Sequence, residues 1–212
     1  MPFLIFDLDG TLIDSKRDIV FSVNGAFQRL GFPSLPEDEV AREIGRGSEY
    51  LFKRLLGMDT PADTIGKLVH GFKEIYQLHL LDHTQLYPGV LEALSYFSHC
   101  PKVIVTNKTQ VLADQVIDGL GLRNYFEGVF GAEAFITRKP DPGPIVEVCR
   151  RWNVTPSETF MIGDSEFDIT AGKAAGVRTI GALYGFSPLE AFRLNPPDFE
   201  IESADQLIGI FK

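Results

Sequence analysis

Two carboxylates one residue apart stand where a predicted strand ends. Residues 3–6 are four consecutive apolar residues of types that strands favour, and Asp7 and Asp9 follow them, with Gly10 and Thr11 next in the chain. Open α/β sheets bind ligands just beyond the carboxyl ends of their strands. Because side chains alternate along an extended chain, Asp7 and Asp9 are expected to face the same side. The pair is therefore expected at a small-molecule site.

Polar residues also follow two later apolar runs. Thr106 and Asn107 come after residues 102–105, and Asp164 comes after residues 160–163. Lys139 precedes a proline, which biases it away from helical dihedrals and keeps it in a loop. If these segments belong to one parallel sheet, their side chains gather at one edge of it.

Convergence of the carboxylates would call for a cation. Two unit charges about 4 Å apart repel by roughly 4 kcal/mol at an effective dielectric near 20. Magnesium takes hard oxygen ligands, commonly one or two carboxylates with water and substrate phosphate. A cluster that includes Asp7 and Asp164 would therefore suit Mg²⁺, and its positive charge would help an acidic protein to bind phosphate.

The four segments resemble, in order, the four motifs of the haloacid dehalogenase-like superfamily, which consists mostly of magnesium-dependent phosphatases. The resemblance covers nearly the whole chain. Three of the four segments directly follow strand-like runs. The matching segments are Asp7-Leu8-Asp9-Gly10-Thr11, Thr106-Asn107, Lys139-Pro140-Asp141-Pro142 and Gly163-Asp164-Ser165-Glu166-Phe167-Asp168.

The resemblance implies roles for three acids. It makes Asp7 the nucleophile and a metal ligand, gives the backbone carbonyl of Asp9 to the metal, and makes Asp164 the remaining protein ligand. A carboxylate that attacks phosphorus forms an aspartyl-phosphate and divides one difficult displacement into two. The Asp9 side chain, kept off the metal, would protonate the leaving group and later deprotonate the attacking water.

Other residues are candidates for binding the substrate phosphate. Lys139 would neutralise its charge together with magnesium, because phosphoryl transfer depends on positioning and charge neutralisation. Thr106 offers a hydroxyl and Asn107 offers backbone and side-chain donors. Gly10, in the acidic loop, is a further phosphate-binding candidate.

Two assignments stay open between a structural and a functional interpretation. Asp168 is either an acid on a helix surface or, as the matching family position suggests, a partner that orients Lys139 or Asp164. Arg46, between two glycines, is either a solvent-facing turn arginine or a cap residue that contacts the non-transferred end of the substrate.

The spacing of apolar residues predicts two kinds of region along the chain. Apolar residues recur at helical spacing between residues 15 and 81, and no convincing strand interrupts them. From Pro88 onward strands alternate with helices, which is typical of parallel βαβ units. We predict strands at 102–106, 129–131, 159–163 and 178–182, with a weaker edge strand at 199–201. Helices are expected near 89–98, 109–120, 142–152 and 166–175, and a loop with a short helix near 188–193.

The predicted fold is α/β, with a Rossmann-like parallel sheet that carries helices on both faces and an inserted all-helical cap domain. The catalytic core would comprise residues 1–14 and 82–212, and the cap residues 15–81. A chain of 212 residues is long enough for this arrangement.

Composition limits the partners. A formal net charge of −9 argues against nucleic acid or an anionic membrane. No segment approaches eighteen apolar residues and no cleavable apolar leader is evident, so a cytoplasmic location is expected. Cys100 and Cys149 are expected to be reduced packing residues. A small phosphorylated metabolite is the expected partner of a monomer or homodimer.

The resemblance favours a phosphatase for a small phosphomonoester. A helical insertion directly after the first motif, with Thr106-Asn107-Lys108 in the second, is most similar to phosphoglycolate phosphatase and related enzymes, which makes phosphoglycolate the leading substrate. Asp9 argues against a dehalogenase, because a halide leaving group needs no proton. A pyrophosphatase and a sugar-phosphate mutase remain alternatives, although residues 12–30 lack the histidine expected of a mutase. A non-enzymatic phospho-accepting signalling module is the alternative from another class.

Overall fold

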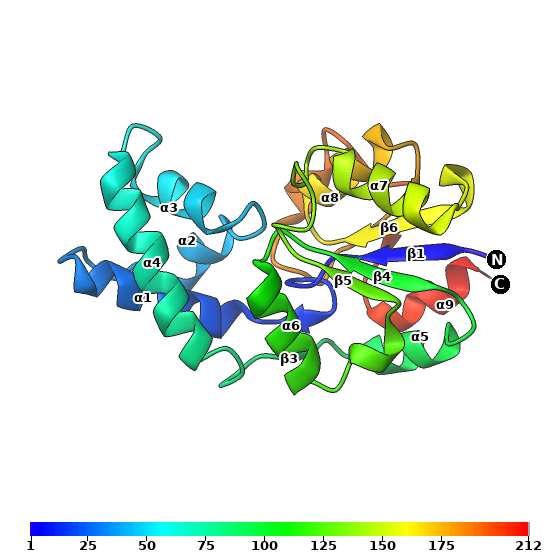
Figure 1. Cartoon of the computed structure of the whole chain (residues 1–212), viewed down its shortest axis with the longest axis horizontal. Helices are drawn as coiled ribbons and strands as arrows, with labels where there is room; N and C mark the ends of the chain where they lie inside the picture. The colour runs from blue at the N-terminus through cyan, green and yellow to red at the C-terminus, as the bar shows by residue number, and fades with distance from the viewer. Residues whose placement is uncertain (212) are drawn as a thin grey trace.

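A six-stranded parallel sheet forms the centre of the larger part of the molecule (Figure 1). The computed structural model describes residues 1–211. The strands are β1 Phe3–Phe6, β4 Lys102–Val105, β5 Gly128–Phe130, β6 Thr159–Gly163, β7 Arg178–Ala182 and β8 Phe199–Ile201. They lie in the order β5-β4-β1-β6-β7-β8, and every neighbouring pair is parallel. The first strand is therefore central, and the residues that follow it are flanked by the ends of β4 and β6.

Helices cover both faces of this sheet because successive residues of each strand point to opposite sides. Phe3 and Ile5 of β1 pack toward α7 and α8, whereas Leu4 and Phe6 pack on the face that carries α5, α6 and α9. All four of these side chains are buried. The helices are α5 Val90–Tyr96, α6 Gln110–Gly119, α7 Gly143–Trp152, α8 Glu166–Ala174 and α9 Leu207–Ile210, with short 3-10 turns at Arg123–Tyr125, Pro156–Glu158, Leu189–Phe192 and Ala204–Gln206.

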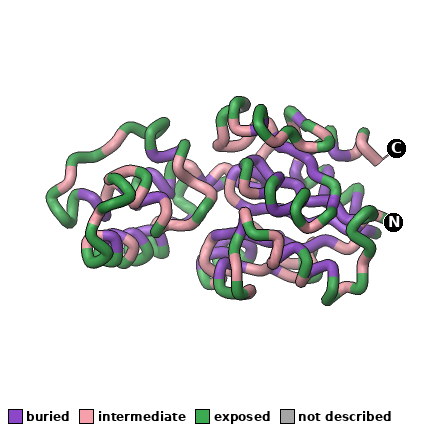
Figure 2. The backbone as a smooth tube through the Cα atoms, turned by 90° about the horizontal axis from the view of Figure 1, so that it is seen from above, coloured by how far each residue is buried: buried purple, intermediate pink, exposed green. Residues whose placement is uncertain are grey.

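Four helices between β1 and α5 form a second body beside the sheet (Figure 1, blue to cyan). They are α1 Lys16–Arg29, α2 Glu37–Ala41, α3 Ser48–Leu56 and α4 Ala62–Leu78. Packed aromatic rings join α1, α3 and α4, with ring centroids 5.8 Å apart for Phe27 and Phe52, 6.1 Å for Phe52 and Phe72, and 5.2 Å for Phe72 and Tyr76. Figure 2 shows buried residues running through the interior of both bodies.

The two connections between these bodies run side by side. Strand β2, Ile13–Asp14, pairs antiparallel with β3, Gln85–Leu86. This short ribbon joins the segment that enters α1 to the segment that returns from α4. Both chain crossings between the helical insertion and the sheet therefore lie in this ribbon.

The predicted fold class is confirmed, and the predicted strands agree with the observed ones to within one residue. The weaker strand at 199–201 is β8, at the sheet edge. The sequence analysis missed α2, α9 and the ribbon of β2 and β3, because two to five residues are too few to show a period. The expected short helix near 188–193 is a 3-10 turn. The division into domains at residues 14/15 and 81/82 stays a prediction.

Two smaller expectations can be compared with the structure. Cys100 and Cys149 are both buried and free, as predicted. Among residues 1–211, no helix combines the length and the apolar character needed to cross a bilayer.

Candidate active site

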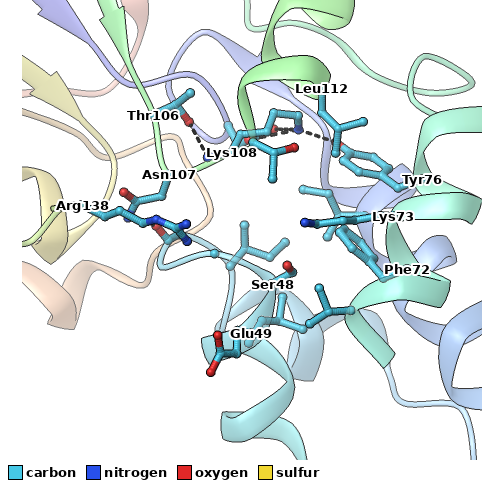
Figure 3. A pocket seen from close by; sticks show the side chains of 18 of the residues that line it. Ser48, Glu49, Phe72, Lys73, Tyr76, Thr106, Asn107, Lys108, Leu112 and Arg138 are labelled. Atoms are coloured by element: carbon cyan, nitrogen blue, oxygen red, sulfur yellow. Dashed lines mark hydrogen bonds and ion pairs between the residues drawn. The ribbon is translucent and has the colours of Figure 1, made fainter. Parts of the chain in front are cut away.

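A pocket lies between the helical insertion and the carboxyl edge of the sheet (Figure 3). Its volume is about 200 Å³, below the range of about 300–1,000 Å³ found for drug-sized ligands, which favours a small ligand. Asp7 and Asp9 line it from the end of β1, and Thr106, Asn107 and Lys108 from the end of β4. Helices α3 and α4 supply the opposite wall. The central position of β1 therefore carries the acidic pair to the boundary between the two bodies.

Asp7 is buried beside a lysine and a second aspartate. Lys139 Nζ lies 2.9 Å from Asp7 Oδ1 and 2.6 Å from Asp168 Oδ1, and all three residues are buried. The first contact is an ion pair whose angles do not make a hydrogen bond, and Asp7 Oδ1 has no hydrogen-bond donor among the described residues. One buried oxygen of Asp7 is therefore not satisfied by a protein donor.

Asp168 bridges the start of α8 and Lys139. Its Oδ2 accepts hydrogen bonds from the backbone amide of Ser165 at 3.1 Å and from the Ser165 hydroxyl at 2.6 Å, so it completes a capping box at α8. Its other oxygen pairs with Lys139. Asp168 is therefore not a surface acid, and its position suits a residue that orients Lys139.

Asp164 lies close to Asp7 and Asp168, and one carboxylate oxygen from each of the three lies within 4.8 Å of the others. Asp164 Oδ2 accepts a hydrogen bond from the backbone amide of Phe186 at 2.8 Å. Gly10, with φ of +85°, approaches this carboxylate so closely that a Cβ on residue 10 would lie 2.3 Å from Asp164 Oδ2. Only glycine fits both this conformation and this space.

Gly10 is also a candidate for binding the substrate phosphate. Its backbone amide donates to the carbonyl of Ile13 at 2.9 Å. The amide is therefore already paired within the chain, and a role of Gly10 in phosphate binding stays a prediction. The glycine leaves room for Asp164.

Burial makes the charged forms of these acids unfavourable. Loss of hydration raises the pKa of Asp7 to about 7, although Lys139 opposes this shift. Burial also raises the pKa of Asp164 well above its ordinary value, and repulsion from Asp168 and Asp7 adds to it. Burial alone would lower the pKa of Lys139, but Asp168 and Asp7 outweigh it and the pKa is raised. These shifts arise because three buried carboxyl groups share a single lysine cation.

The residues present fit a divalent cation. Asp7 offers an oxygen without a donor, Asp164 offers an adjacent carboxylate, and Asp168 is already held by Lys139 and Ser165. Two carboxylates, Asp7 beside Lys139 and Asp164 beside the amide of Phe186, with positions left for water and substrate, match the habits of magnesium. The side chain of Asp9 does not belong to this cluster.

Asp9 instead belongs to a network that the sequence analysis missed. Its carboxylate accepts hydrogen bonds from Lys108 Nζ at 2.8 and 3.1 Å and from the Ser15 hydroxyl at 2.5 Å. Lys108 Nζ also donates to the hydroxyl of Tyr76, on α4, at 2.6 Å (Figure 3). Although burial opposes it, pairing with Asp9 raises the pKa of Lys108, so this lysine is a cation. Its position directly after Thr106-Asn107 was the one available signal.

Thr106 and Asn107 both line the pocket. The Thr106 hydroxyl accepts a hydrogen bond from the backbone amide of Lys108 at 3.1 Å, which leaves its own hydrogen to donate. The Asn107 side chain donates to the carbonyls of Gly45 at 2.8 Å and Lys139 at 2.9 Å. Its amide thus links an insertion loop to the core, and only the backbone N–H of Asn107 remains available for a phosphate among the described contacts.

Arg46 does not line the pocket. Its guanidinium carbon lies 4.5 Å from the ring centroid of Tyr50 and 5.7 Å from that of Phe167. Cation–π packing thus accounts for its position. The expectation that Arg46 contacts the substrate is not supported by this geometry. The cations that the insertion and the neighbouring core loop present to the pocket are Lys73 and Arg138 instead.

A family model described as haloacid dehalogenase-like hydrolase matches residues 4–182, most of the chain. The chain belongs to the haloacid dehalogenase-like hydrolase family. The recognition made from the four motifs is thereby confirmed, and so is the expectation of an enzyme of the hydrolase class.

Relatives match this haloacid dehalogenase-like hydrolase along almost its full length. A phosphoglycolate phosphatase from Chromobacterium violaceum is 33% identical over 98% of this chain and 95% of its own, and one from Vibrio parahaemolyticus is 33% identical over 99% and 96%. The crystal structure of a predicted phosphoglycolate phosphatase from Haemophilus somnus has a TM-score of 0.93 at 26% identity, and the match covers 100% of this chain and 98% of that one.

Proposed function

We propose that this hydrolase is a magnesium-dependent phosphatase that cleaves a small phosphomonoester by way of a phosphorylated Asp7. The observation that carries the proposal is the buried Asp7 carboxylate, which faces the pocket, contacts Lys139 and has one oxygen without a hydrogen-bond donor. Full-length similarity to proteins named phosphoglycolate phosphatase supports a phosphoric monoester hydrolase and makes phosphoglycolate the leading substrate.

Two displacements would make up the reaction. An oxygen of Asp7 attacks phosphorus while the bond from phosphorus to the alcohol oxygen breaks, and Asp9 gives its proton to that departing oxygen. Water then attacks the phosphorus of the aspartyl-phosphate, Asp9 takes the proton of the water, and inorganic phosphate leaves with the Asp7 carboxylate restored. Separate surroundings for Asp7 and Asp9 suit these separate roles.

Charge neutralisation and positioning would come from groups around Asp7. Lys139 would face the phosphoryl oxygens, and the Thr106 hydroxyl and the Asn107 backbone amide would donate to them. Asp168 would hold Lys139 in place. The Asp7 and Asp164 carboxylates and the Asp9 backbone carbonyl would hold magnesium, which when bound offsets negative charge on the phosphoryl group.

Turnover distinguishes this enzyme from the phospho-accepting alternative. We expect purified protein with Mg²⁺ to release many equivalents of phosphate from p-nitrophenyl phosphate, a chelator to abolish the release, and added Mg²⁺ to restore it. Asp7→Asn should lower the rate by about 10,000-fold or more, as removal of other enzymic nucleophiles does. Asp14→Asn is the matched control, because Asp14 lies in the same segment outside the pocket.

Two results would overturn the proposal. Undiminished turnover in Asp7→Asn would remove Asp7 as the nucleophile. A single equivalent of stable phosphorylation without turnover would favour the signalling module. A cytoplasmic location and a monomer or homodimer remain predictions from the sequence.

A further inference from the structure

Two cations project into the pocket from opposite sides, away from the acidic cluster. Lys73 comes from α4 in the insertion, and Arg138 comes from the core loop just before Lys139. In Figure 3 the ammonium of Lys73 and the guanidinium of Arg138 both point into the cavity, toward one another. Neither belongs to the four motifs, and the proposed reaction uses neither.

No carboxylate of the described chain pairs with either cation. Lys73 makes no ion pair or side-chain hydrogen bond within residues 1–211, and Arg138 makes one hydrogen bond, from Nε to the carbonyl of Ala132 at 3.2 Å. The other two lysines at the site, Lys108 and Lys139, are both paired with aspartates. Lys73 and Arg138 thus differ from them in having donors to spare.

The nearby acids already have partners. Glu49 Oε1 lies 2.6 Å from Lys53 Nζ, and Glu133 Oε2 accepts a hydrogen bond from the backbone amide of Gln110 at 2.9 Å. The hydrogen bond and the charge of Lys53 lower the pKa of Glu49, and the charge of Arg138 adds to this lowering. This wall of the pocket therefore has cationic donors in excess over unpartnered acids.

The N-terminus of helix α3 also favours an anion at this wall of the pocket. Gly47, Ser48 and Glu49 line the pocket at the start of this nine-residue helix, and the preceding residue provides no side-chain cap. Unsatisfied amides at a helix N-terminus favour a negative charge. The Ser48 side chain also faces the cavity (Figure 3).

We infer that Lys73 and Arg138 form a second anion subsite, which binds a negatively charged group on the non-transferred part of the substrate. The inference rests on the proposed phosphatase function, since it assigns the far end of the same substrate. A carboxylate and a second phosphate share the chemistry that a guanidinium fork and an ammonium recognise. The substrate class is therefore a short phosphomonoester with a second anionic group, and a neutral alcohol phosphate is discriminated against.

Matched substrates test the inference. Values of kcat/KM are measured with Mg²⁺ for phosphoglycolate, for ethylene glycol bisphosphate and for 2-hydroxyethyl phosphate, which is similar in size but lacks the second charge. We divide kcat/KM for phosphoglycolate or the bisphosphate by kcat/KM for 2-hydroxyethyl phosphate. We expect Lys73→Gln and Arg138→Gln each to lower this ratio by about 10- to 100-fold, which corresponds to the loss of one charge-assisted hydrogen bond. The loss should be mainly in KM, and Lys73→Arg should recover most of it.

A ratio measured on one preparation cancels the fraction of active protein, so partial misfolding cannot imitate the effect. Lys67→Gln is the matched control, because Lys67 lies on α4 but pairs with Asp63 at the surface. Its ratio should equal that of the unmodified protein. Comparison of the carboxylate with the bisphosphate then decides which anion the subsite prefers.

The two proposals fail in different ways. One outcome is that the unmodified protein hydrolyses phosphoglycolate and ethylene glycol bisphosphate with a kcat/KM no higher than that for 2-hydroxyethyl phosphate. That result would refute the subsite and leave the phosphatase proposal intact. Unchanged ratios in both glutamine variants would refute it equally. Absence of turnover with every phosphomonoester would instead refute the proposed function.

Discussion

Asp7 and Asp9 are separated by one residue, yet they meet different surroundings. Asp7 lies with Lys139 and two further aspartates, whereas Asp9 is held by Lys108 and a hydroxyl. A proton donor must reach the leaving group without being bound to the cation that holds the nucleophile. The side chain of Asp9 lies outside the acidic cluster, which is consistent with the proton-donor role that we propose for it.

The role of Asp9 can be tested through the leaving group. In Asp9→Asn we expect kcat/KM for alkyl phosphates to fall by about 100- to 10,000-fold, the usual contribution of a general acid. The loss should shrink for aryl phosphates, because a phenolate of low pKa needs little protonation. The measurement is a plot of log kcat/KM against leaving-group pKa for both proteins, and the variant should show the steeper dependence.

Equal losses across all leaving groups would count against the acid role. Asp14→Asn, which alters an acid outside the pocket, should leave the slope as it is in the unmodified protein.

Among individual site residues, those in short motifs could be predicted from the sequence. Those brought to the site by contacts between distant segments could not. Asp7 and Asp164 follow predicted strands and Lys139 precedes a proline, and a parallel sheet brings the ends of these strands together. Lys108 meets Tyr76 across 32 positions and Asp9 across 99. For Arg46 the sequence left open whether it faces solvent or contacts the substrate, and in the structure it packs against Tyr50 and Phe167.

Among the elements, the long ones were predicted and the short ones were not. Buried parallel strands are continuous apolar runs, so β4, β6 and β7 could be located closely. Helix α2 has five residues, and the ribbon strands have two each. Their formation depends on the ends of larger elements rather than on local periodicity.

The junction between insertion and core depends on one buried acid. Asp18, in the first turn of α1, accepts hydrogen bonds from the backbone amides of His83 and Thr84 and from the Thr84 hydroxyl at 2.7–3.1 Å. Its side chain therefore fastens the start of the insertion to the segment that leaves it. Asp18 is almost completely buried, so water cannot replace these bonds.

Removal of this acceptor should destabilise the whole protein. In Asp18→Ala we expect the free energy of unfolding to fall by about 2–4 kcal/mol, because buried donors lose their partner. Since 1 kcal/mol changes Tm by about 2–4 °C in a chain of this size, Tm should fall by about 4–16 °C in thermal unfolding. Asp18→Asn keeps one acceptor oxygen and should lose less.

Asp38→Ala is the control for this element, because Asp38 is an exposed acid at the start of α2. A Tm for Asp18→Ala equal to that of Asp38→Ala would show that the bonds at the junction contribute nothing measurable.

Over the whole molecule, a net charge of −9 coexists with a pocket that we propose to bind an anionic substrate. Three cations, Lys73, Lys108 and Arg138, line this pocket beside four acids, and both bodies contribute to its wall. Composition predicted that positive charge had to be local, but not where. The relative placement of insertion and core decides it, and no pattern within a single segment reports that placement.

The acidic cluster predicts that a bound cation stabilises the whole chain. Asp7, Asp164 and Asp168 bring their carboxylates together in a buried region that Lys139 alone only partly neutralises. A ligand that binds only the folded state stabilises it by about 2.7 kcal/mol at a hundred times its Kd. We therefore expect saturating Mg²⁺ to raise Tm by about 5–11 °C, which thermal unfolding with and without a chelator would measure.

Asp164→Asn separates metal binding from general salt effects. The asparagine keeps an oxygen for the amide of Phe186 but removes a negative charge that repels Asp7 and Asp168, so the metal-free variant should unfold at the same temperature as the unmodified protein or above it. Its response to Mg²⁺ should shrink to about 2 °C or less, since one of the two proposed carboxylate ligands is gone. Asp38→Asn, which alters an exposed acid, should keep the full response. If Asp164→Asn responded to Mg²⁺ as strongly as Asp38→Asn, the cation would have to bind elsewhere, and the buried acids would need another source of positive charge.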